Sequence, residues 1–169
     1  VFSKNLSNPK ITNYKPLLIF FDSGLNVSTH VIYEDSVLDS KITSSNDLNG
    51  SYHLEQLKSG NIAMYAHGVL IIANANGTRI SSSYFEGTKN NQAMLSLGDS
   101  FVISTDTNLR KFDANGSQIK ELNYPGNYLP EILNLNGNLF FIAGYDMGGE
   151  VKLLYGSTDT DLNPINLND

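Results

Sequence analysis

The stretch Leu97–Ile119, LGDSFVISTDTNLRKFDANGSQI, decides the fold because related stretches stand before and after it in the chain. It predicts two short strands, Phe101–Ser104 and Leu109–Phe112, joined by a tight turn of Asp, Thr and Asn. The corner Asp113–Gly116, DANG, then leads into a third strand at Ser117–Leu122. We interpret the stretch as the body of a unit made of short strands and tight turns.

The same plan recurs at a regular distance. Asn76-Gly77 in one unit and Asn115-Gly116 in the next are 39 residues apart, and a third version occupies Leu133–Pro164. Four-stranded units of about 40 residues are typical of β-propeller blades. The sequence therefore predicts an all-β, β-propeller-like chain of about four four-stranded blades. We place these blades within a single domain, at approximately 1–50, 51–90, 91–128 and 129–169.

Two other all-β folds compete with this interpretation. A β-sandwich also has short strands at close spacing, but it gives no reason for a repeat of 39 residues. A β-prism would repeat the pattern Gln-x-Asp-x-Asn-x-Val-x-Tyr, from which the segment 104–112 departs at the Gln and Val positions.

In the first unit, the continuous apolar run Leu17–Phe21 predicts a strand that is buried on both faces.

Composition narrows the class of protein. The 169 residues, 18.6 kDa in mass, suit one domain with a sizeable core. A net charge of -6 and scattered Lys and Arg argue against a nucleic-acid partner. The absence of cysteine excludes disulfides and thiolate chemistry. The longest apolar runs are about five residues, against roughly 20 for a bilayer span, so we expect no membrane insertion. The first residue is Val, which indicates processing or a piece of a longer chain.

Two stretches carry a family resemblance. LNLNGNLFFIAGYDMGGEVKLLYGSTDTDLNP (Leu133–Pro164) resembles the ELWxxDGT-type repeats of bacterial surface proteins, with NGNLFF present. Val151–Tyr155 stands for the ELW strand and Ser157–Asp159 for DGT, and the Trp is missing. FVISTDTNLRKFDANGSQI (Phe101–Ile119) resembles NHL-type or quinoprotein-type blades. The resemblance implies a propeller with a binding or scaffolding role in a secreted or cell-surface bacterial protein, and it transfers no catalytic residue.

The candidate site follows from this expected fold. In a propeller, the turns between the second and third strands of all blades open on one rim of the axial funnel. We expect these turns at Asp22–Asn26, Ala66–Gly68, Thr105–Thr107 and Gly144–Glu150. The residues they offer as ligands are Asp22, His67, Asp106, Tyr145, Asp146 and Glu150. Such a ring could hold Ca²⁺ or a polyol. The competing interpretation is that each Asp bonds the backbone N–H groups of its own turn.

Other motifs indicate less. The run Asp159-Thr-Asp161-Leu-Asn163 matches the first three ligand positions of an EF-hand loop, but Pro164 replaces the required Gly, so we interpret it as a solvated turn. The three histidines have no metal-binding spacing, and no GxSxG elbow occurs. Spacing does not exclude paired carboxylates of a glycosidase, since such pairs meet only in three dimensions.

The sequence thus predicts a non-catalytic binding or assembly module of a secreted or surface bacterial protein. Its partner would be a carbohydrate or a protein, and its blade edges would allow self-association. One alternative is a carbohydrate-active enzyme, or an accessory domain of one, that uses the funnel carboxylates. Another alternative is a structural filament or tail subunit.

Overall fold

The computed structural model describes residues 2–4, 14–34, 52–66, 68–85, 93–105, 107–124, 128–146 and 151–168. Within these ranges the chain forms fifteen strands and no helix, and hence no helix that could span a membrane. All strand pairs are antiparallel and join into four sheets. The prediction of an all-β chain is confirmed.

Each sheet is a meander, so strands that are neighbours in the chain pair with each other. Sheet I contains β1 (Phe2–Lys4), β2 (Tyr14–Phe21) and β3 (Val27–Ile32). Sheet II contains β4 (Tyr52–Gln56), β5 (Ile62–Ala66), β6 (Val69–Ala73) and β7 (Arg79–Tyr84). Sheet III contains β8 (Met94–Ser96), β9 (Ser100–Ser104), β10 (Asn108–Asp113) and β11 (Gln118–Asn123). Sheet IV contains β12 (Tyr128–Leu135), β13 (Asn138–Asp146), β14 (Val151–Asp159) and β15 (Pro164–Asn168).

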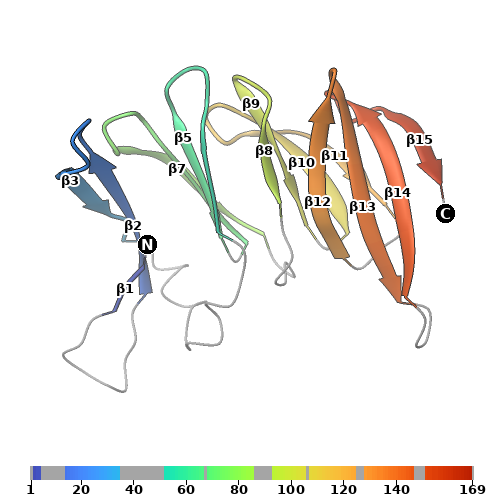
Figure 1. The fold of residues 1–169 in the computed structure, drawn as a ribbon, viewed down its shortest axis with the longest axis horizontal. Coiled ribbons are helices and arrows are strands. Elements are labelled where there is room, and N and C mark those ends of the chain that lie inside the picture. The colour runs from blue at the N-terminus through green and yellow to red at the C-terminus, as the bar shows by residue number, and fades with distance from the viewer. Residues whose placement is uncertain are drawn as a thin grey trace.

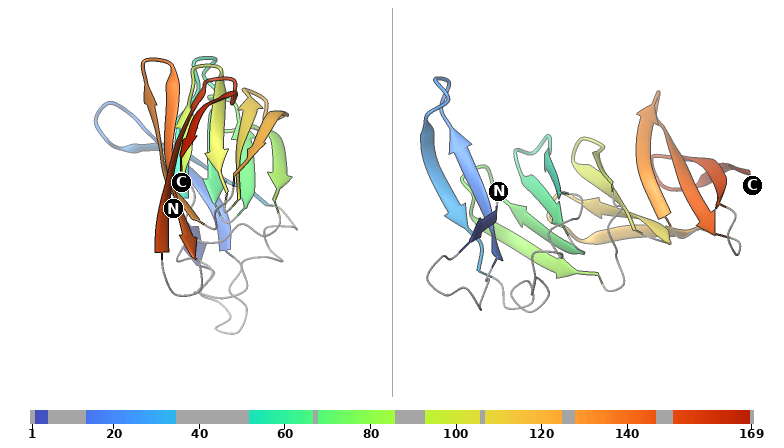
Figure 2. Two further views of the ribbon diagram at one scale, coloured as in Figure 1. Left: turned by 90° about the vertical axis from the view of Figure 1, so that its right-hand side faces the viewer. Right: turned by 60° about the horizontal axis from the view of Figure 1, so that its bottom comes forward.

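The four sheets stand in a row in chain order (Figure 1). The row is curved, and sheets I and IV lie at its opposite ends (Figure 2, right). A separate apolar cluster fills each of the three spaces between neighbouring sheets. In the middle space Phe101 stacks on Phe112 with ring centroids 5.3 Å apart. The inner sheets therefore bury both faces, and each end sheet buries one.

The burial of individual strands follows from this arrangement. All five residues of β6 are buried, because β6 lies in the middle of a sheet that has neighbours on both sides. Leu17–Phe21 looks similar in sequence, and the prediction that this run is buried on both faces is wrong. Leu18 is buried, but Phe21 is 57% exposed. Sheet I has a neighbouring sheet on one side only within the described residues, so alternate side chains of β2 face outward.

Candidate functional site

Asp22 is the one residue of the predicted funnel site whose side chain the structure describes. His67, Asp106 and Glu150 lie outside the described residues, and Tyr145 and Asp146 end β13 with side chains that are not described. The carboxylate ring therefore stays a prediction. Among the described residues, no three His, Asp or Glu side chains gather closely enough to hold a metal ion.

The Asp22 carboxylate is engaged within its own turn. Its Oδ1 accepts hydrogen bonds from the backbone N–H groups of Gly24 and Asn26, at 2.8 and 2.9 Å. Chiefly the Asn26 N–H, and then the Asn26 side chain, hold the pKa of Asp22 below its usual range. In this structure the side chain closes a turn, as the competing interpretation expected.

The Asp22 turn is one of four copies of the same five-residue turn. They span Asp22–Asn26, Asn74–Thr78, Asp113–Ser117 and Asp159–Asn163. In each copy the side chain of the first residue accepts the N–H groups of the third and fifth residues. The fourth residue always has a positive φ. In each copy the pairing of the two strands shifts register between the two residues that directly precede the turn. This shared geometry defines a structural repeat, which we call the closing turn.

The closing turn joins the third and fourth strands of sheets II, III and IV. By this equivalence, β2 and β3 of sheet I correspond to a third and a fourth strand. Asp22–Asn26 thus lies between the second and third strands of sheet I as predicted, but its turn has the geometry of the third-to-fourth turns of the other sheets. In a meander, the turns between second and third strands and those between third and fourth strands lie at opposite ends of a sheet, and Figure 1 shows the β2–β3 tip at the upper edge and the end of β13 at the lower edge.

The closing turns of sheets II, III and IV place their fourth residue against the preceding sheet. In sheet II this residue is Gly77, and a Cβ there would lie 2.7 Å from Val31 Cγ2 and 3.0 Å from Phe20 Cε2 of sheet I. The hydroxyl of Tyr33, the residue directly after β3, donates a hydrogen bond to the Gly77 carbonyl at 2.8 Å. Glycine is needed here for the positive φ and for the close approach.

The contact between sheets II and III repeats this geometry. A Cβ on Gly116 would lie 2.8 Å from both Ile72 Cγ1 and Ser81 Oγ. Ser81 donates a hydrogen bond to the Asn115 carbonyl, and Asn61 Nδ2 donates to the Ala114 carbonyl at 2.9 Å. Side chains of the preceding sheet thus donate hydrogen bonds to the backbone carbonyls of the closing turn.

Sheet IV docks on sheet III with a leucine in place of glycine. Leu162 has a φ of 58° and is 0% exposed, within the cluster that contains Val102 and Leu109. Beside it, Lys111 Nζ of sheet III lies 2.6 Å from Asp161 Oδ1. A positive φ is unfavourable for leucine, so we infer that burial of the side chain offsets the cost.

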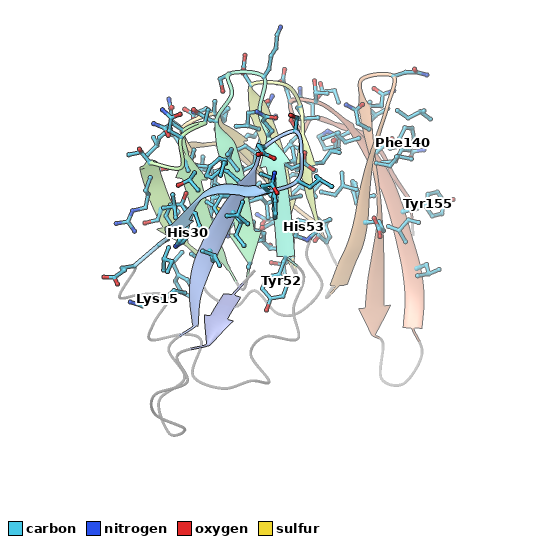
Figure 3. All side chains as sticks on the ribbon, turned by 60° about the vertical axis from the view of Figure 1, so that its left-hand side comes forward. Lys15, His30, Tyr52, His53, Phe140 and Tyr155 are labelled. Atoms are coloured by element: carbon cyan, nitrogen blue, oxygen red, sulfur yellow. The ribbon has the colours of Figure 1, made fainter. Side chains whose placement is uncertain are left out.

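Sheet I carries the same leucine in an exposed position. Leu25 has a φ of 62° and is 81% exposed. Phe21, Val27 and Ile32 are exposed beside it on the outward side of sheet I. Together these four residues define what we call the sheet I end face. His30, on the same side because it pairs with Ile19, is exposed as well (Figure 3).

Sheet IV exposes a larger apolar surface at the other end of the row. Strand pairing places six apolar side chains on its outward side, and all six are exposed. They are Leu133, Leu135, Phe140, Ile142, Leu153 and Tyr155, which we call the sheet IV end face. Figure 3 shows Phe140 and Tyr155 on the side of sheet IV turned away from the other sheets. Exposed apolar patches of this kind are typical of interaction surfaces.

A sequence signal for these end features exists but was missed. Asp22–Asn26 reads DSGLN and Asp159–Asn163 reads DTDLN, so both share D-x-x-L-N. The Asn-Gly corner marks only the two inner closing turns. Aligning the four turns by their first Asp or Asn would have grouped all of them and set Leu25 beside Leu162.

Comparisons with known proteins do not identify the chain. No protein-family model matches it, and no curated protein matches it. Among solved structures it is similar to Kluyveromyces lactis Hsv2 with its complete loop 6CD, at 13% identity and a TM-score of 0.38, over 69% of this chain and 36% of that chain. It is also similar to a protein of unknown function from Bacteroides caccae, at 7% identity and a TM-score of 0.34, over 92% of this chain and 73% of that one. Neither similarity assigns a fold or a function to this chain. The resemblance to ELWxxDGT and NHL repeats stays a prediction.

Proposed function

We propose that the chain is a non-catalytic assembly module, built of four propeller-like blades, that binds other protein domains through its two end faces. The observation that carries the proposal is the placement of exposed apolar side chains. Most of the large ones lie in sheets I and IV, whereas the spaces between sheets are filled. A row of sheets that buries apolar faces against one another has an unused apolar face at each end.

The chemistry of the end faces favours a protein partner. The sheet IV end face combines aliphatic and aromatic side chains, with Glu131 as its charged neighbour on β12. Interfaces between proteins are enriched in aromatic residues and depleted of charge at their centre. The net charge of -6 gives no attraction for nucleic acid. The proposal also includes a secreted or surface location, which rests on composition and the family resemblance, and association through the edges of the blades.

Binding of a hydrophobic dye tests whether the sheet IV end face is an accessible interaction surface. We expect a chain with both Phe140→Ser and Tyr155→Ser to fold normally but to enhance the fluorescence of anilinonaphthalene sulfonate less than the wild type, since this dye reports exposed apolar surface. Ile119→Ser is the matched control, because Ile119 is 56% exposed on β11, away from both end faces. Unchanged dye fluorescence in the double variant, or loss of its folded state, would contradict the proposal.

A glycan array, read in calcium and then in chelator, tests the carbohydrate alternative. Exposed aromatic side chains can stack on sugars, and the predicted carboxylate ring could hold calcium. We expect no glycan signal in either buffer. Glycan binding that Tyr155→Ser abolishes would assign the sheet IV end face to carbohydrate and overturn the protein-assembly proposal.

A further inference from the structure

We propose that the sheet I end face of one molecule docks on the sheet IV end face of a second copy, head to tail. The docking would repeat the contact that joins neighbouring sheets inside the molecule. Every internal contact has a closing turn on one side and a receiving sheet on the other. Among the residues that the structure describes, no sheet receives the closing turn of sheet I and no closing turn lies on the outward side of sheet IV. This inference rests on the proposed function and names its partner.

The receiving position is the same in all three internal contacts. It is the residue two places before the closing turn of the receiving sheet, next to the register shift. The observed contacts are Phe20 with Gly77, Ile72 with Gly116, and Lys111 with Asp161. In sheet IV the corresponding residue is Ser157, two places before Asp159.

Side-chain size at this position complements the turn that it receives. The bulky Phe20 and Ile72 face turns whose fourth residue is glycine. Lys111, an unbranched chain whose ammonium pairs with Asp161, faces the turn with Leu162. Ser157 has the smallest side chain of the four, and the turn that lacks a receiving sheet is the one with Leu25. A small side chain opposite a large one fills the space between two sheets without steric overlap.

The surroundings of Ser157 match those that bury Leu162. Strand pairing sets Phe140 opposite Ser157, as it sets Val102 opposite Lys111. Tyr155 lies four residues before its closing turn, as Leu109 does. Val102 and Leu109 belong to the cluster around Leu162, so Phe140 and Tyr155 are the side chains that Leu25 of a second copy would contact.

A polar contact is also available at the same place. Asn163 and Asn26 are held alike, each donating from Nδ2 to the carboxylate of the first residue of its turn. Lys120 of sheet III donates to Asn163 Oδ1. The residue of sheet IV that corresponds to Lys120 is Asn166, which is exposed and pairs with Ser157. Its amide is placed to donate to Asn26 Oδ1 of the second copy.

The docking joins two different surfaces, so it is heterologous and would produce rings or open filaments. The ion pair between Lys111 and Asp161 has no counterpart, since Ser157 and Gly24 occupy the corresponding positions. We therefore expect self-association to depend on protein concentration and to change little with salt.

Analytical ultracentrifugation of variants blocked at one end tests the proposal. Leu25→Asp blocks the turn, and Tyr155→Asp blocks the receiving face; both residues are more than half exposed, so both variants should fold. We expect the wild type to self-associate and each variant alone to do so at least about tenfold more weakly. An equimolar mixture of the two should form a one-to-one dimer and nothing larger, because it retains one intact surface of each kind.

Controls separate this docking from other forms of association. Ile119→Asp should associate like the wild type, and Leu25→Gly, which restores the residue of the inner turns, should weaken association without disturbing the turn. The proposal is overturned if the wild type stays monomeric up to about 1 mM. It is equally overturned if either blocked variant associates like the wild type, or if their mixture stays monomeric. A monomeric wild type whose dye binding still depends on Phe140 and Tyr155 would remove the self-partner and leave the proposed function standing.

Discussion

The closing turns at the two ends of the chain share a sequence pattern and a backbone but not an environment. Leu25 and Leu162 occupy the same fourth position with φ angles of 62° and 58°, yet one is 81% exposed and the other 0%. The turn is set locally, by an Asp whose carboxylate accepts the N–H groups of the third and fifth residues of the turn. The energetic role of the leucine is set by whether a sheet stands against it. The comparison isolates the contribution of docking between sheets from that of the turn.

Truncation of the two leucines should have very different effects on stability. Leu162→Ala should lower the free energy of unfolding by about 2–4 kcal/mol, because it leaves a cavity between sheets III and IV. Leu25→Ala should change it by less than about 0.5 kcal/mol. A positive φ is nearly as unfavourable for alanine as for leucine. The difference between the two losses of stability therefore measures the burial of the leucine side chain. Urea unfolding followed by circular dichroism measures both, at protein concentrations where the chain is monomeric, and equal losses would break the comparison.

Adding a methyl group at an inner closing turn should lower the free energy of unfolding somewhat less than Leu162→Ala does. Gly116→Ala should lower the free energy of unfolding by about 2–3 kcal/mol, because Ile72 and Ser81 would each lie 2.8 Å from the new Cβ. Gly60 is the control, since it has a φ of 88° and nothing within 4 Å of its Cβ position. Gly60→Ala should cost only about 1 kcal/mol, the expense of the backbone conformation. If the two variants lose the same stability in urea, the sheets do not press on the turn as described.

Local features of the fold could be predicted from the sequence. The predicted strands Phe101–Ser104 and Leu109–Phe112 are short runs bounded by turn residues, and the structure has β9 and β10 at those residues. The corner at Asp113–Gly116 forms the turn that its Asn-Gly pair indicates. These features depend on contacts between residues a few positions apart, which a single sequence displays directly.

The placement of surfaces could not be predicted in the same way. Leu17–Phe21 has the composition of a doubly buried strand, but Phe21 faces outward because sheet I ends the row. The sequence predicts Asp22 at the funnel rim because its turn is interpreted as one between second and third strands, whereas its geometry is that of the closing turns. Whether an apolar side chain forms core or an end face depends on the number of sheets beside it. That number is a property of the assembled chain, and no residue pattern records it.

The smallest expected effect concerns the acidic residues that open the two leucine turns. The Asn163 side chain is the largest cause of the lowered pKa of Asp159, and Lys120 of sheet III contributes as well. Asp22 also has a lowered pKa, from its own turn, but no lysine contributes to it. Because both folded pKa values are depressed, each carboxylate stabilises the fold above about pH 3.9, and this contribution is lost as the pH falls through the folded pKa.

Replacing Lys120 should therefore separate the two ends of the chain. In Lys120→Met, the pKa of Asp159 should rise toward its ordinary value while the pKa of Asp22 stays where it is, as measured by NMR titration of the side-chain carboxyl groups. Asp159→Asn keeps the acceptor that Asn74 supplies in sheet II and should make the acid loss of stability less steep. An unchanged Asp159 titration in Lys120→Met would mean that the docked turn has the same electrostatic surroundings as the free one, and that docking on sheet III is felt through packing alone.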